Sequence, residues 1–141
     1  NMKFLFIPVA SGVIVKNNKI LIGLRAEGDS GAGMWEFPGG KIELNESSES
    51  AIKRELREEL DIDATVNQKI MKYSHRFKNT IYEISFFEIN KFTGSIKKNV
   101  HDDLQWIELA SLKKYRFISG DLLLIDRILA NPTLLNGLTI N

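Results

Sequence analysis

Residues 40–46 read GKIELNE, and seven residues later the chain reads RELREELDI over positions 54–62. In a helix, Glu55, Glu58 and Glu59 fall at i, i+3 and i+4, so one turn presents all three carboxylates on one face. Like charges at that spacing destabilise an isolated helix by about 0.2–0.5 kcal/mol per pair. This cluster, with Glu46 just upstream, therefore predicts a bound positive charge, and carboxylate oxygens suit hard cations such as Mg²⁺ or Mn²⁺.

The same residues also fit a plain amphipathic surface helix with a solvated acidic face. Ile52, Leu56 and Leu60 form an apolar stripe at helical spacing, roughly a right angle away from the carboxylates at about 100° per residue. The preceding residues 37–40, Phe-Pro-Gly-Gly, favour the metal site. Proline makes this turn rigid, and the two glycines are free to adopt positive φ.

The composition is that of an ordinary globular protein. The 141 residues are 43% hydrophobic and 26% charged, which predicts a single domain spanning 1–141 with its core at about 7–130. A net charge of +1 argues against stable nucleic-acid binding or attachment to an anionic membrane. The absence of cysteine excludes disulfides and thiolate chemistry. We expect a cytoplasmic protein, because no apolar run reaches 18 residues and the apolar stretch at 4–10 is too short for a signal peptide.

The hydrophobic pattern predicts more strands than helices and hence an α+β fold. The helix at the acidic cluster is followed by a second, C-terminal helix, which Asn131-Pro132 ends, leaving a peripheral tail. The other predicted elements are a hairpin of strands 8–15 and 20–24, a glycine-rich loop at 26–33, strands 65–77, 80–89 and 104–108, and the C-terminal helix at 120–130.

The acidic stretch resembles the Nudix box, G-x5-E-x7-R-E-U-x-E-E-x-G-U, where U is a bulky aliphatic residue. The chain departs from this pattern only at Asp61, where the family usually has glycine. We expect Asp61 to end the helix as an imperfect left-handed cap. The matching positions are Gly40, Glu46, Arg54, Glu55, Leu56, Glu58, Glu59 and Ile62.

From Ile7 to about Leu129 the chain is similar to the MutT-like branch of the Nudix hydrolases, above all in the run WEFPGGKIE at 35–43. The resemblance implies an α/β/α sandwich with a mixed central sheet and a catalytic loop–helix–loop. It also implies Mg²⁺-dependent hydrolysis, with Mn²⁺ as a substitute, of a nucleoside triphosphate to the monophosphate and pyrophosphate, including oxidised nucleotides such as 8-oxo-dGTP.

The resemblance also assigns roles to individual residues. Glu58, Glu59 and the carbonyl of Gly39 match metal ligands, and Glu55 matches a general base or additional ligand. Arg54 and Glu46 match residues that orient the helix carboxylates by ion pairing. These residue types suit the chemistry, because an anionic pyrophosphate needs a cation and a spare carboxylate accepts a proton from water.

A fourth metal carboxylate of MutT-like enzymes precedes a tryptophan on a later strand, and here the residue before Trp106 is Gln105. Asp103 lies two residues earlier, on the same face of a regular strand, and is the predicted replacement. Asp102 and His101 are weaker candidates. An equally good interpretation is that residues 101–103 are a polar loop that leads into a strand.

Recognition of the base rests on three residues, each with an alternative role. Arg25 matches a substrate-contacting arginine or is a surface charge beside the loop, and Phe37 stacks on the base or fills the core. Asp121 matches a residue that faces the base edge, where a carboxylate accepts hydrogen bonds, or it caps the last helix. We expect His75 to be structural or at the rim of the site rather than catalytic.

Three other functions fit parts of the sequence. These are hydrolysis of nucleoside diphosphate sugars of the GDP-mannose type, RNA 5′-pyrophosphohydrolysis, and non-catalytic nucleotide sensing. The intact carboxylate cluster argues against the last. The expected partner is a small-molecule nucleotide, and the expected assembly is a monomer or homodimer with no membrane contact.

Overall fold

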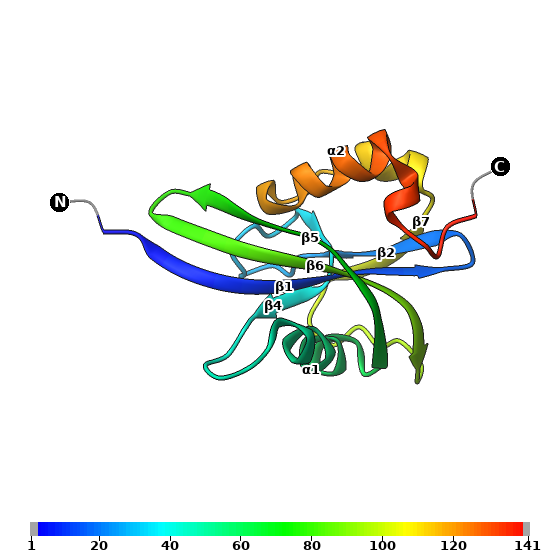
Figure 1. Ribbon diagram of the computed structural model, residues 1–141, viewed down its shortest axis with the longest axis horizontal. Helices are drawn as coiled ribbons and strands as arrows, with labels where there is room; N and C mark the ends of the chain where they lie inside the picture. Colours follow the sequence, from blue (N-terminus) through cyan, green and yellow to red (C-terminus); the bar gives the residue numbers. More distant parts are fainter. Residues whose placement is uncertain (1–2, 140–141) are drawn as a thin grey trace.

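The computed structural model describes residues 3–139, and one mixed sheet separates the two α-helices, which cover its opposite faces (Figure 1). This arrangement confirms the predicted α+β class with a mixed central sheet. In chain order the strands and helices are β1 (Leu5–Lys16), β2 (Lys19–Leu24), β3 (Trp35–Glu36), β4 (Gly39–Lys41), α1 (Ser48–Leu60), β5 (Asp63–Phe77), β6 (Thr80–Thr93), β7 (Asp103–Ile107) and α2 (Leu122–Ala130), with short 3₁₀ turns at Leu109–Lys114, Ser119–Asp121 and Pro132–Leu134.

The seven strands run in the order β3-β2-β1-β6-β5, with β4 added to β1 and β7 added to β2. Among the strand pairs within residues 3–139, only β1–β6 is parallel. The predicted β1–β2 hairpin turns at Asn17 and Asn18, which both have positive φ, as a two-residue hairpin turn of this kind requires. Near the end of β2, Gly23 pairs with Glu36 of β3 on one edge and with Leu104 of β7 on the other, so β2 brings β3 and β7 close together there.

Helix α1 has a defined beginning and end. The hydroxyl of Ser47 accepts a hydrogen bond from the Ser50 N–H at 3.1 Å, which satisfies one of the free donors of the first turn. Asp61 ends the helix in the left-handed conformation, at φ 59° and ψ 37°, which confirms its predicted role. The buried face packs on the sheet and consists of Ala51, Ile52, Leu56 and Leu60.

The loop before β7 closes the C-terminal end of α1. The Lys97 N–H donates to the Leu60 carbonyl at 2.9 Å, and the Asn99 N–H donates to the Glu59 carbonyl at 3.2 Å. The side-chain amide of Asn99 donates to the Glu58 carbonyl at 3.1 Å. These donors satisfy helix carbonyls that have no partner within the helix, and they fix the loop to the end of α1 that bears Glu58 and Glu59.

The core has one apolar cluster on each face of the sheet, one beneath α1 and one beneath α2. The tail after α2 joins the second cluster through the buried Leu135. The N–H groups of Asn136 and Gly137 also donate to the buried Glu88 carboxylate, at 3.0 and 2.7 Å. The prediction of a peripheral tail, with the core ending near residue 130, is therefore wrong. Among residues 3–139, no helix has the length and apolar character needed to cross a membrane.

Candidate active site

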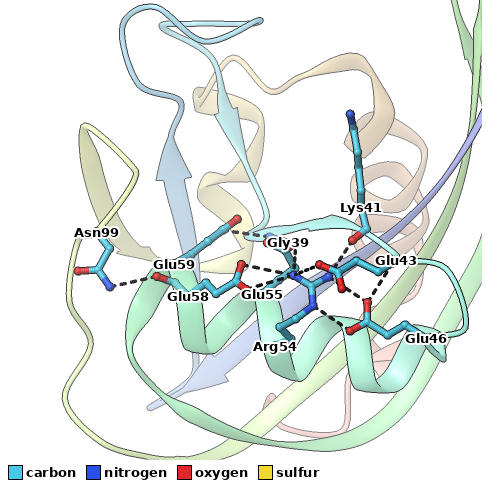
Figure 2. A network of polar contacts seen from close by, with 9 residues as sticks. All are labelled: Gly39, Lys41, Glu43, Glu46, Arg54, Glu55, Glu58, Glu59 and Asn99. Carbon is cyan, nitrogen blue, oxygen red and sulfur yellow. Dashed lines mark hydrogen bonds and ion pairs between the residues drawn. The ribbon is translucent and has the colours of Figure 1, made fainter.

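Arg54 is the centre of the polar network beside α1 (Figure 2). Its guanidinium grips Glu46 with two hydrogen bonds, Nε to Oε2 at 2.8 Å and Nη2 to Oε1 at 2.9 Å, and also donates to the Lys41 carbonyl at 3.0 Å. These bonds to Arg54, with help from the Glu43 N–H, lower the pKa of Glu46 to about 2, and the pKa of Arg54 is raised in turn. Through these hydrogen bonds, Arg54 of α1 holds Lys41 and Glu46, and with them the loop before α1, in place against the helix.

The three carboxylates of α1 lie in different environments (Figure 2). The Glu58 side chain is 57% exposed and lies 3.3 Å from Nη1 of Arg54. Glu55 is 14% exposed and accepts from the same Nη1 at 3.0 Å. The Glu59 carboxylate turns inward and accepts the Gly39 N–H at 3.3 Å. The structure thus brings Glu55 and Glu59 toward Gly40 and Gly39 of β4, while Glu58 lies at the solvent side of Arg54.

The two glycines of β4 are required by close approach. A Cβ on Gly40 would lie 2.5 Å from the carboxyl carbon of Glu55. A Cβ on Gly39 would collide with the Ala10 backbone on β1. Glycine at both positions therefore lets the backbone of β4 reach the carboxylates of α1.

The donors present fit a divalent cation. Burial raises the pKa of Glu59, and the neighbouring charges of Glu36 and Glu55 raise it further. The carboxylates of this site outnumber its arginines. Arg25 pairs with Glu36, and Arg54 lies within ion-pair distance of Glu43, Glu46, Glu55 and Glu58. The charges of Glu36 and Glu55 also act on Glu59. An excess of closely spaced carboxylate oxygens is the donor set that hard cations prefer.

A second group of side chains adjoins Glu59 from the β2–β3–β7 edge of the sheet. Ligand atoms of Glu36, Glu59 and His101 all lie within 4.8 Å of one another. The Glu36 carboxylate is held from both sides, by Nη1 of Arg25 at 2.6 Å and by Nε2 of His101 at 2.8 Å. Sequence reasoning gave His101 only a minor place and missed Glu36. The available signal was an acidic residue between Trp35 and Phe37. In a strand, the two aromatic side chains share one face, and Glu36 lies on the opposite face.

Asp103 does not reach this group. Its carboxylate accepts from the Leu104 N–H and from the Gln105 side-chain amide, both at 2.9 Å, so residues 103 and 105 share a face of β7 as expected. The alternate residues, Leu104 and Trp106, pack into the cluster beneath α1, which puts Asp103 on the opposite face from Glu59. This geometry does not favour Asp103 as a metal ligand. Asp102 accepts a loop N–H, that of Glu27, at 2.9 Å.

The predicted base-reading residues are held by internal contacts. The Phe37 ring is 2% exposed and packs against Phe86 and Phe117, so in this conformation it fills the core, which is the second of its two predicted roles. Arg25 is not a free surface charge, because it donates to Glu36 and to the Ser30 carbonyl. Its contact with substrate stays a prediction.

Asp121 begins α2 but makes no side-chain capping bond. Instead its carboxylate, on a residue only 2% exposed, accepts the backbone N–H of Phe37 at 3.0 Å. Burial raises its pKa well above the ordinary value, against the lowering effect of this hydrogen bond. The side chain therefore ties α2 to the segment before β4. Asp121 does occupy the N-cap position of α2, but its side chain does not cap the helix.

Two side chains of β5 fasten the turn that carries Asp121. His75 Nε2 lies 2.9 Å from the Ser119 hydroxyl, and the Tyr73 hydroxyl donates to the Gly120 carbonyl. Burial raises the pKa of Tyr73 to about 12, with a contribution from the charge of Asp121. His75 thus makes a structural contact with the turn that carries Asp121.

Comparisons with known proteins agree on one family. A family model described as "NUDIX domain" matches residues 10–127. The chain is 32% identical over 124 residues to the CTP pyrophosphohydrolase of Escherichia coli K12, covering 88% of this chain and 92% of that protein. It is also 32% identical over 124 residues to an 8-oxo-dGTP diphosphatase of Haemophilus influenzae, covering 87% and 91%. The solution structure of the E. coli ORF135 protein superimposes with a TM-score of 0.81 at 31% identity, covering 90% of this chain and 91% of that one.

Proposed function

The chain belongs to the Nudix hydrolase family, and on that premise we propose that it hydrolyses a nucleoside triphosphate to the monophosphate and pyrophosphate. The observation that carries the proposal is the position of the α1 carboxylates beside Gly39 and Gly40 of β4. Arg54 holds Glu55 and Glu58, and the Gly39 N–H holds Glu59. In this proposal the whole chain acts as a single Nudix domain.

Glu58, Glu59 and the Gly39 carbonyl are the proposed holders of a divalent cation, Mg²⁺ with Mn²⁺ as a substitute. When bound, the cation neutralises phosphate charge and makes a water molecule more acidic. The support is the donor set described above, in which Glu59 is buried beside Glu36 and Glu55 without an arginine of its own. The inward turn of Glu59 and the hydrogen bond from Gly39 keep that carboxylate directed at the turn.

Glu55 is the proposed general base. Arg54 donates to Oε1 at 3.0 Å, which fixes the carboxylate and leaves Oε2, which Arg54 does not contact, as the proposed acceptor of a proton from water. Glu46 in turn fixes Arg54, so the role of these two residues is to orient the base rather than to touch the reacting atoms.

For the substrate we propose a nucleoside triphosphate whose base is read near Asp121. One relative named for CTP and one named for 8-oxo-dGTP are each 32% identical to this chain over 124 residues. A raised pKa favours the protonated form of Asp121, and a protonated carboxyl both donates and accepts. The sequence suggested a group that only accepts. Because the residue is buried, contact with a base requires a change from this conformation.

A substrate panel tests this proposal. CTP, dCTP, dGTP, 8-oxo-dGTP, a nucleoside diphosphate sugar and a 5′-triphosphorylated RNA are each incubated with Mg²⁺, and pyrophosphate and phosphate release are measured separately. The proposal expects the highest kcat/KM on a free triphosphate with pyrophosphate as product. A higher kcat/KM on the sugar nucleotide or the RNA would overturn it.

A further inference from the structure

We infer that Glu36 is a further ligand of the metal ion at this site, next to Glu59. Arg25 and His101 are positioning residues that hold the Glu36 carboxylate in place. The inference rests on the proposed function, because it adds a ligand to the metal site proposed there.

The first support is the position of Glu36. It is 8% exposed, and one of its oxygens lies in a group with ligand atoms of Glu59 and His101 whose members are all within 4.8 Å of one another. The three residues come from β3, α1 and the loop before β7, so the convergence is a product of the tertiary fold. Carboxylates are almost never buried side by side unless a cation or a shared proton relieves their repulsion.

The second support is the orientation of the carboxylate. Arg25 Nη1 contacts Oε1 at 2.6 Å and His101 Nε2 contacts Oε2 at 2.8 Å. An ionised carboxylate has about four lone-pair sites, so these two contacts leave room for a metal on each oxygen. Bonds of this kind to ligating carboxylates fix their orientation at metal sites.

The third support is that His101 has no freedom to move away. Its side chain is 2% exposed and lies over Gly23, where an added Cβ would be 2.5 Å from the ring. The loop that carries it is tied to the end of α1 by the bonds of Lys97 and Asn99 described above. The fold therefore sets His101, and through it Glu36, at a fixed place beside Glu59.

Among the described residues of β7 and the loop before it, no acidic side chain lies beside Glu59 in place of Glu36. Asp103 and Gln105 point to the opposite face of β7, and Asp102 accepts a loop N–H. A simple Arg25–Glu36 ion pair on the surface would explain neither the burial nor the proximity of Glu59.

Metal binding, measured without substrate, tests the inference. Mn²⁺ is titrated into the purified protein, and free Mn²⁺ is followed by electron paramagnetic resonance, with circular dichroism as a check on folding. Glu36→Gln keeps the size of the side chain and is expected to weaken Mn²⁺ binding at least tenfold. Asp103→Asn is the matched control, because it removes a nearby carboxylate on the other face, and it is expected to leave binding unchanged.

Glu59→Gln separates this inference from the proposed function. If Glu59→Gln weakens binding and Glu36→Gln does not, the inference is overturned and the proposed site stands. If neither variant weakens binding, the proposed metal site itself fails. If Glu36→Gln does not fold, the Mn²⁺ affinities of Arg25→Lys and His101→Gln test the inference instead. A loss of roughly 10- to 100-fold in Mn²⁺ affinity supports their positioning role, and unchanged affinity in both overturns it.

Discussion

Replacing Asp61 by glycine should stabilise the protein. Asp61 ends α1 at φ 59° and ψ 37°, where its N–H donates to the Arg57 carbonyl at 3.0 Å. The left-handed conformation costs an L-residue about 1–2 kcal/mol, with aspartate at the lower end because its short polar side chain tolerates it. Glycine removes that cost and restores the residue that the Nudix pattern has there.

Two effects oppose this gain. Glycine is more flexible in the unfolded chain, which costs about 0.4–1 kcal/mol. The ion pair from Lys97 to Asp61, at 3.3 Å, is also lost, but both side chains are largely exposed, at 65% and 44%, and such pairs contribute little. The net gain is therefore about 0.5 kcal/mol, or a rise in melting temperature of about 1–2 °C for a chain of this size.

The assay is thermal unfolding followed by circular dichroism at one pH and salt concentration. Asp61→Ala is the control, because it removes the same ion pair but keeps a Cβ in the left-handed conformation, and it should melt below the wild type. The argument is refuted if Asp61→Gly melts no higher than Asp61→Ala. Catalytic turnover should not change in either variant, since the Asp61 carboxylate faces Lys97.

Three further predictions address the site. Arg54→Lys keeps the charge but not the two-pronged grip, so kcat should fall roughly 10- to 100-fold with the fold intact by circular dichroism; unchanged kcat would contradict the orienting role. Asp121 has a raised pKa in the native state, so the native form binds its proton more tightly and loses stability as pH rises above the unfolded value, near 3.8. Asp121→Asn, which still accepts the Phe37 N–H, should therefore gain in melting temperature over the wild type as pH rises from 4 to 8, and a constant difference would count against this. Gly23→Ala would push on the His101 ring and should lower the free energy of unfolding by about 1–3 kcal/mol in urea titrations; wild-type stability would show that the ring yields easily.

The acidic helix was predictable because its information is local. The spacing of Glu55, Glu58 and Glu59 and the left-handed end at Asp61 follow from helical geometry alone. The β1–β2 hairpin is likewise set by the short polar turn between two apolar runs.

The second half of the site was not predictable in this way. Glu36 and His101 are 65 residues apart and meet only because β3 and β7 border the two edges of β2 near Gly23. For Asp103 the strand alternation was predicted correctly, but which face turns toward α1 depends on packing of Leu104 and Trp106, which a single sequence does not specify. The tail was misjudged for the same reason, since its partner is Glu88 in the middle of β6.

Phosphorus NMR of the products is the most direct test of the central claim. The wild type is incubated with a nucleoside triphosphate in the presence and absence of Mg²⁺, alongside Glu59→Gln. We predict Mg²⁺-dependent formation of the monophosphate and pyrophosphate by the wild type, and a loss of orders of magnitude in the folded variant. Formation of the diphosphate and orthophosphate, or an undiminished rate in Glu59→Gln, would contradict the account.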